Sequence, residues 1–127
     1  MARVWRRRYA PDDPVLGAVL DGIGRLPEAG PQETWGIVTL RVRGKIFGWF
    51  VGGLDGAERW LAFKPAPSEM AAFAEDPRMR REPHSQHWFE LNLDQVADWD
   101  EVMELLTDAY ALVAPKELAD RVGGRPR

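Results

Sequence analysis

The stretch "TWGIVTLRVRGKIFGWFVGG", residues 34–53, constrains the fold of this chain more than any other segment. Two runs rich in β-branched and aromatic residues flank Arg43-Gly44, a pair typical of tight hairpin turns. A turn of two residues predicts three facing pairs: Val42 with Lys45, Leu40 with Phe47, and Val38 with Trp49. The segment is therefore expected to form an antiparallel β-hairpin.

The alternation of side chains divides this hairpin into two faces. One face is predicted to carry Val38, Leu40, Val42, Phe47, Trp49 and Val51. The other is predicted to carry Ile37, Thr39, Arg41, Ile46 and Phe50. The first set is more apolar and is expected to face the core.

Helical and extended patterns alternate around the hairpin. Apolar spacing predicts a helix that Asp13 caps and Pro27 stops, and a short helix capped by Ser68 that ends at Asp76-Pro77. Further strands are expected in "RWLAFK" (59–64) and "WFELNLD" (88–94), with Leu61, Phe63, Phe89, Leu91 and Leu93 inward and Trp60, Ala62, Lys64, Trp88, Glu90 and Asn92 outward.

The last third of the chain predicts a long amphipathic helix. Asp98 is placed to cap it, Pro115 to break it, and "KELADRV" continues as a further turn. The order α-β-β-β-α-β-α predicts a two-layer α/β (α+β) protein, an antiparallel sheet with its helices on one side. Residues 1–14 are interpreted as a basic arm, 15–120 as one domain, 78–87 as an irregular basic loop and 121–127 as a tail.

Composition narrows the function classes. The chain has no cysteine, which excludes disulfides and thiolate chemistry. The basic N-terminus lacks the apolar region of a secretory signal, and no apolar run could span a bilayer, so a cytoplasmic protein without membrane contact is expected. The net charge is −3, yet residues 1–81 hold 13 Arg and Lys against 10 Asp and Glu. One part of an acidic chain can thus present a positive surface.

Catalytic and metal chemistry find little support. His84 and His87 are three residues apart, but no third ligand is spaced with them and the flanking loop is basic, so solvated loop histidines are the simpler interpretation. Neither Ser68 nor Ser85 lies in a nucleophile motif. We therefore expect no enzyme activity, no cofactor and no metal.

The outward face of the sheet is the remaining candidate site. Exposed tryptophans with basic residues between them could stack bases and contact phosphates. The predicted nucleic-acid-binding residues are Arg41, Arg43, Lys45, Trp60, Lys64, Arg78, Arg80, Arg81, His84 and Trp88. Three alternatives stay open: a homodimer or other protein interface on this face, a face covered by the arm or first helix, and a strand register shifted by one residue.

Several segments, in order, resemble the MmcQ/YjbR family of small bacterial proteins. They are "RLPEA", "WG…TLRVRGKIFGWF", "LAFKPAPSEMAAFAEDP", "PHSQHWFELNLD" and "DWDEVMELLTDAYALVAPKEL", spanning about Val15 to Ala119. The positions that match the family are Gly44, Lys45, Phe47, Trp88, Tyr110, Pro115 and Lys116, whereas Ala109 stands where the family often has serine.

The resemblance implies a fold similar to that of secretion chaperones, with a strongly bent antiparallel sheet. It also implies DNA binding, a role proposed for the family from its shape in a double-wing arrangement. It implies no catalytic residue. The partners to be tested are consequently DNA and, in the rival interpretation, a second copy of the chain or another protein.

Overall fold

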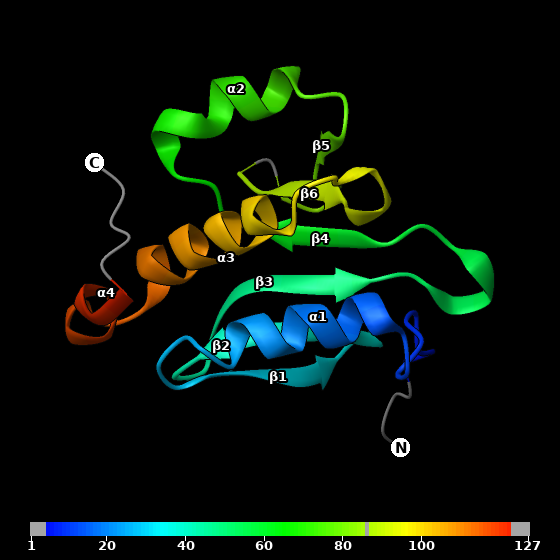
Figure 1. Ribbon diagram of the computed structural model, residues 1–127, viewed down its shortest axis with the longest axis horizontal. Coiled ribbons are helices and arrows are strands. Elements are labelled where there is room, and N and C mark those ends of the chain that lie inside the picture. Colours follow the sequence, from blue (N-terminus) through cyan, green and yellow to red (C-terminus); the bar gives the residue numbers. More distant parts are fainter. Residues whose placement is uncertain (1–4, 86, 123–127) are drawn as a thin grey trace.

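The computed structural model describes residues 5–85 and 87–122. In this part of the chain, six strands form one antiparallel sheet in the order β1-β2-β3-β4-β6-β5 (Figure 1). The strands are β1 (Ala29–Thr34), β2 (Ile37–Val42), β3 (Lys45–Val51), β4 (Trp60–Phe63), β5 (Met79–Arg81) and β6 (Phe89–Asn92). The helices are α1 (Pro14–Ile23), α2 (Met70–Glu75), α3 (Trp99–Val113) and α4 (Lys116–Val122).

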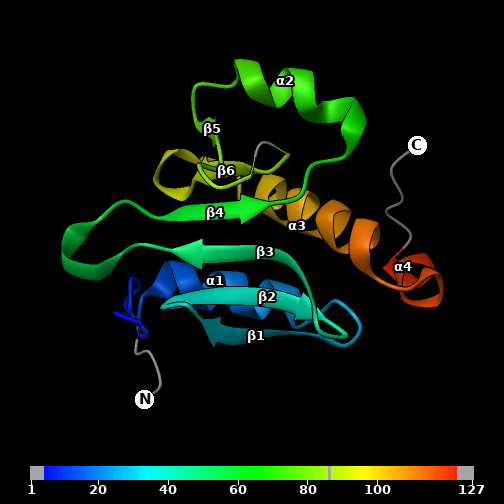
Figure 2. The same ribbon diagram turned by 180° about the vertical axis from the view of Figure 1, so that it is seen from behind.

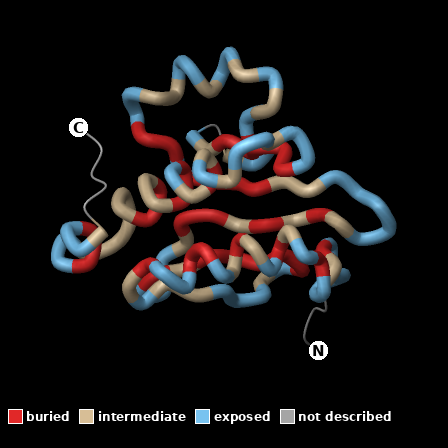
Figure 3. Tube along the Cα trace, viewed as in Figure 1, coloured by how far each residue is buried: buried red, intermediate tan, exposed pale blue. Residues whose placement is uncertain are grey.

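The helices pack on one side of the sheet, as predicted. Helices α1 and α3 lie in front of the strands in Figure 1 and behind them in Figure 2. Phe73 of α2 meets Phe63 and Phe89 edge to face, so α2 contacts the same side of the sheet. Figure 3 shows the buried positions concentrated along the central strands and the inner faces of these helices. The expected α+β class is confirmed.

Two edge strands were not predicted. β1 has the sequence AGPQET, without apolar alternation, and β5 has three residues inside the expected basic loop. Both lie at the edges of the sheet, where one side of the strand needs no partner. Pro31, which lacks an amide hydrogen, is tolerated in such a strand. The predicted strand count was therefore too low.

The hairpin turn was predicted correctly, but its register was not. Val42 faces Lys45 across the Arg43-Gly44 turn, whereas a β-bulge places Leu40 opposite Gly48 and Val38 opposite Phe50. A bulge inserts one residue into one strand, and a shift of one residue exchanges the faces beyond it. The predicted inward position of Trp49 and Val51 and the predicted outward position of Phe50 were consequently wrong.

The buried core follows from this corrected register. Phe47 and Phe50 are both fully buried, while Trp49 and Val51 lie on the sheet face opposite the helices, next to Ile37 and Ile46. The orientations predicted within β4 and β6 were correct, but Lys64, predicted to point outward, follows β4 and lies on the helix side. The inward residues are Leu61, Phe63, Phe89, Leu91 and Leu93.

The helix caps agree with expectation at two of three positions. The Asp13 carboxylate accepts a hydrogen bond from the Val15 amide at 2.8 Å, and that of Asp98 accepts one from the Asp100 amide at 3.0 Å. Ser68 is not a cap, because it lies inside a short 3₁₀ turn that precedes α2. A break at Pro115 separates α3 from α4, as predicted. Most of the predicted tail, 123–127, lies outside the described residues.

Tyr110 ties the first hairpin to the last long helix. Its ring is fully buried and meets the ring of Phe47 edge to face, with centroids 5.7 Å apart. Burial raises the pKa of Tyr110, so its hydroxyl stays protonated and donates a hydrogen bond to the Pro27 carbonyl at 2.6 Å. Two segments that carry the family resemblance are therefore in direct contact.

Arg78 joins β5 to α3 through two carboxylates. Its guanidinium donates hydrogen bonds to Asp76 and to Glu101 at distances of 2.7–3.1 Å. These hydrogen bonds lower the pKa of both carboxyl groups. The ionised carboxylates therefore stabilise the fold above the ordinary carboxyl pKa, and this stabilisation is lost as the pH falls through the lowered values.

Arg78→Met should consequently lower the free energy of unfolding by about 1–2 kcal/mol at neutral pH, since hydrogen bonds to charged groups are worth about that much when partly exposed. Urea unfolding at pH 7 and at about pH 2, below the ordinary carboxyl pKa values, measures the effect. The difference from the wild type should shrink at the acidic pH. Lys116→Met, which removes an exposed ion pair with Asp120, is the control and should change little. An equal deficit at both pH values would contradict this role.

No helix among the described residues is both long enough and apolar enough to cross a membrane.

Candidate functional site

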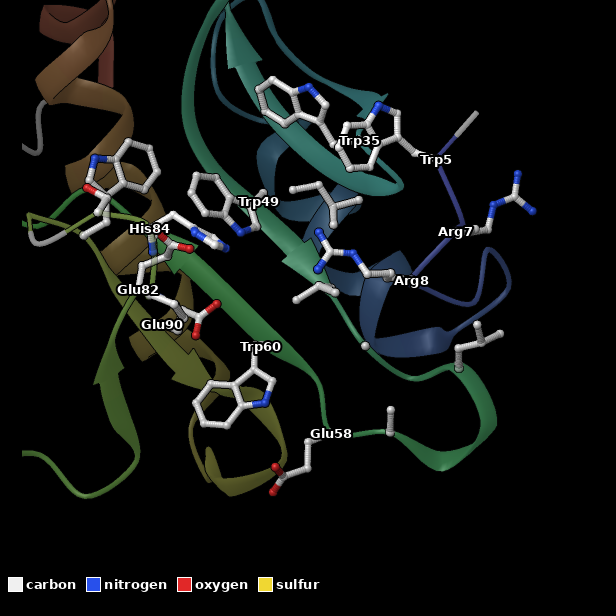
Figure 4. Close-up of a pocket in the computed structure, with 18 of the residues that line it drawn as sticks. Trp5, Arg7, Arg8, Trp35, Trp49, Glu58, Trp60, Glu82, His84 and Glu90 are labelled. Carbon is white, nitrogen blue, oxygen red and sulfur yellow. Dashed lines mark hydrogen bonds between the residues drawn. The ribbon is translucent and has the colours of Figure 1, made fainter. Parts of the chain in front are cut away.

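A groove of about 980 Å³ lies on the face of the sheet opposite the helices (Figure 4). Five of the six tryptophans of the chain line it, and the sixth, Trp99, belongs to α3 on the other side. Pockets of this size that are lined by aromatic side chains and a few charged groups are typical of ligand-binding sites. The tryptophans of the groove are Trp5, Trp35, Trp49, Trp60 and Trp88.

The floor of the groove is aromatic because of the β-bulge. The bulge turns Trp49 of β3 away from the core, and its ring stacks on that of Trp88, with centroids 5.0 Å apart and planes 19° apart. Trp60 of β4 lies further along the same face, where strand alternation places it. All three rings are half-buried, so each is held in place and still presents surface to the groove.

The N-terminal arm forms one bank of the groove. The Arg8 amide donates to the Gly36 carbonyl at 2.8 Å, and the Gly52 amide donates to the Arg8 carbonyl at 2.9 Å. Tyr9 is buried, and its hydroxyl contacts the Glu33 carboxylate. These contacts hold Arg8 and Tyr9 across the start of β2 and the end of β3.

Gly36 is required for this docking. Its φ of 79° belongs to a tight hairpin turn with Trp35, and a Cβ there would lie 2.1 Å from the Arg6 carbonyl oxygen. The close approach of the arm brings Trp5 next to Trp35, each about half exposed at 49% (Figure 4). The arm covers one end of the sheet face, and the face as a whole stays open.

The opposite bank carries carboxylates. Glu82 and Glu90 line the groove and are only 6% and 5% exposed, and they lie with His84 between Trp49 and Trp60 in Figure 4. One Glu82 oxygen accepts a hydrogen bond from the His84 amide at 2.9 Å.

Arg80 shields part of this bank. Its guanidinium donates to Glu90 at 2.7 Å and lies over the Trp60 ring at 3.7 Å from the centroid, a cation–π contact. The positive charge of Arg80 thereby compensates the negative charge of Glu90. Within the part of the chain that the structure describes, Glu82 forms no ion pair, so its carboxylate faces the groove more directly.

The arginines of the arm differ in where they point. Arg7 and Arg8 both line the groove, but Arg7 donates to Glu33 at 3.3 Å, whereas the guanidinium of Arg8 extends over the groove toward Trp49 (Figure 4). Arg6 also lines the groove. The groove therefore has a cationic bank on the arm and an opposite bank where Glu82 is anionic and Glu90 is paired with Arg80.

Four of the predicted site residues meet in this groove: Trp60, Arg80, His84 and Trp88. The other six lie elsewhere. Arg43 donates two hydrogen bonds to Glu28, which lower the pKa of that carboxyl group, and Arg78 is held by Asp76 and Glu101 on the helix side. Arg41 donates to Thr34, Thr39 and the Gly44 carbonyl.

The three remaining cations are also outside the groove. Lys45 is exposed at the hairpin turn. Lys64 lines a shallow depression on the helix side together with Phe73 and Leu105. Arg81 lies over the ring of Phe89, 5.0 Å from its centroid. The predicted set is therefore divided between the groove and other parts of the surface.

Sequence reasoning missed Trp5, Trp35, Trp49 and Arg8. Trp49 was assigned to the core because the bulge was not foreseen, and the others lie in the arm and in a turn that had no predicted partner. The number of tryptophans was the available signal, since six in 127 residues exceed what one core of this size needs.

The groove offers ring stacking, an anion site and hydrogen-bond acceptors. Among residues 5–85 and 87–122 no three His, Asp or Glu side chains are grouped to hold a metal ion. His84 and His87 are both exposed. The residues present are thus suited to binding a flat ligand that carries an anionic group.

The fold and the groove define a small α+β protein with an aromatic binding face, and comparison with known proteins identifies its family. The family model described as YjbR matches residues 24–112, and the chain belongs to the YjbR family. This is not a known enzyme family.

A crystal structure of a protein from Pseudomonas syringae is similar in fold. Its TM-score is 0.62 at 17% identity, and the match covers 76% of this chain and 96% of that one. No curated protein matches the chain. The arm that forms one bank of the groove precedes the residues matched by the family model.

Proposed function

We propose that this protein is a non-enzymatic binding module that holds single-stranded nucleic acid in the tryptophan groove. The observation that carries the proposal is the gathering of five tryptophans in one groove beside Arg6 and Arg8. Base–aromatic stacking tolerates every base, because each has a π face, and nearby arginines can contact the phosphates. The setting we propose is the bacterial cytoplasm.

The ion pairs on the surface indicate that electrostatic attraction contributes only modestly to the binding of nucleic acid. Arg43, Arg78 and Arg80 are each occupied by carboxylates of the chain itself. Arg6 and Arg8 both line the groove, and neither forms an ion pair with another residue that the structure describes. Binding should therefore be weak, and stacking should supply most of it. Duplex DNA, whose bases are already stacked on one another, should bind less well than a single strand.

The salt dependence of binding tests the proposal. Two phosphate contacts on a single strand predict a slope of about −1.4 in log K against log salt, since each contributes about −0.7. Fluorescence anisotropy of a labelled mixed-sequence oligonucleotide of about ten nucleotides, within the usual site size of such proteins, gives this slope. Arg8→Gln should reduce the slope by about half. Arg43→Gln, the matched control, should leave it unchanged because Arg43 is bound to Glu28.

The rival function is a protein interface on the same face. An apolar interface has little dependence on salt, whereas phosphate contacts release counterions. No binding of a single strand even at low salt would contradict the proposed function. In that case concentration-dependent self-association, measured by sedimentation and weakened by Trp88→Ala, would support a homodimer interface on the aromatic face.

A further inference from the structure

The groove has arginines on one bank and carboxylates on the other, above an aromatic floor. We infer that it selects bases that carry an exocyclic amino group, with the Glu82 carboxylate as their acceptor. This inference rests on the proposed function and refines it from tolerance of every base to a preference among bases. The two banks, Arg8 on the arm and Glu82 at the end of β5, face each other across Trp49 (Figure 4).

The position of Glu82 is fixed by hydrogen bonds within the protein. The residue is 6% exposed, and its backbone is held by hydrogen bonds from the Glu82 amide to the Trp88 carbonyl and from the Ser85 amide to the Glu82 carbonyl. The side chain is fixed in addition by the His84 amide. A carboxylate accepts more than one hydrogen bond, so Glu82 retains acceptor capacity for a ligand in the groove.

The two neighbouring carboxylates are not equivalent. Glu90 already accepts from Arg80, which itself lies on Trp60, so its charge is largely compensated within the protein. Glu82 accepts from a neutral amide. A donor on the ligand therefore gains more from Glu82 than from Glu90.

The ligand chemistry follows from the placement of Arg8 and Glu82 on opposite sides of the tryptophans (Figure 4). A nucleotide stacked on Trp49 or Trp88 can direct its phosphate toward Arg8 and the edge of its base toward Glu82. Cytosine presents an N4 amino donor on that edge, and carboxylates pair with it in known protein–DNA contacts. Thymine presents the O4 acceptor at the same place, which a carboxylate repels. The two pyrimidines have similar size, so they differ mainly in this group.

Homopolymers of deoxycytidine and deoxythymidine of about ten nucleotides, the usual size of such a site, test the inference by anisotropy at neutral pH. The wild type should bind the cytidine oligomer at least about fivefold more tightly, the lower limit for one good side-chain–base pair. Glu82→Gln should bring the two affinities within about twofold, since an amide both donates and accepts. Glu104→Gln, which makes the same change of charge on the exposed side of α3, should keep the preference.

The outcomes separate the two proposals. Equal affinity of the wild type for both oligomers would overturn the amino-group preference and leave single-strand binding intact. A preference that persists unchanged in Glu82→Gln would show that Glu82 is not the acceptor and would also overturn the inference. Absence of binding to both oligomers at low salt would contradict the proposed function itself, and the inference with it.

Discussion

Trp88→Ala should weaken the binding of a single-stranded oligonucleotide by about 1–3 kcal/mol, or roughly 5- to 150-fold in Kd. The expected loss is large because Trp88 presents its own face to the groove and also supports Trp49, on which it stacks. Without Trp88, the Trp49 ring loses its neighbour and gains rotational freedom. Anisotropy titrations of the wild type and the variant measure the change.

The chain supplies a matched control in its sixth tryptophan. Trp99 begins α3 on the helix side of the sheet, so Trp99→Phe should leave the affinity within about twofold of the wild type while changing the same type of residue. Circular dichroism of both variants verifies that they are folded. Unchanged affinity in folded Trp88→Ala, or an equal loss in Trp99→Phe, would contradict binding in the tryptophan groove.

Tyr110→Ala should lower the free energy of unfolding by about 3–5 kcal/mol, the usual cost of removing a fully buried aromatic side chain. The substitution opens a cavity beneath Phe47 and leaves the Pro27 carbonyl without its donor. Because a small domain has a total stability of about 5–15 kcal/mol, a loss of this size is a large part of the whole. Urea unfolding followed by circular dichroism measures it.

Tyr110→Phe separates the hydrogen bond from the packing. The ring and its contact with Phe47 are kept, so only the bond to Pro27 is lost, and a decrease of about 1–2 kcal/mol is expected. If both variants lost the same free energy, packing of the ring on Phe47 would not be the main contribution. If neither lost more than about 0.5 kcal/mol, the range of neutral surface changes, Tyr110 would not be part of the core.

The central part of the fold could be predicted from the sequence, and its edges could not. Strands β2, β3, β4 and β6 are buried on the helix side, and burial imposes an alternating apolar pattern that the sequence displays. An edge strand such as β1 pairs with only one neighbouring strand. Its polar residues and Pro31 show no alternating apolar pattern. A three-residue strand such as β5 is too short for any periodicity to be recognised.

The bulge in β3 was not predicted, and this omission had the largest effect on the predicted site. Arg43-Gly44 fixes the hairpin turn through local backbone preference, and this part of the register was predicted correctly. The bulge opposite Leu40 has only a weak local signal, since a glycine inside a strand, such as Gly48, often marks a bulge but does not fix its position. In the folded protein, the Cβ missing from Gly48 would lie 2.8 Å from the Ala62 carbonyl oxygen, a long-range contact that the sequence does not reveal.

The candidate site was predicted in part for the same reason. Trp60 and Trp88 follow from strand alternation, and both line the groove. The cations were harder to place, since an exposed arginine in the sequence can be bound to a distant carboxylate, as Arg43 is to Glu28. Arg8 enters the groove through backbone hydrogen bonds of the arm, which depend on Gly36 and Gly52 far along the chain.

The chemical shifts of the six indole N–H groups, recorded during titration with a single-stranded oligonucleotide, test the central claim most directly. We expect the signals of Trp49, Trp60 and Trp88 to shift in proportion to binding, while that of Trp99 stays in place. Trp5 and Trp35 should follow the groove signals if the strand reaches the arm. Shifts confined to Trp99, or binding with no movement of the groove signals, would show that nucleic acid binds elsewhere and would contradict the proposed function.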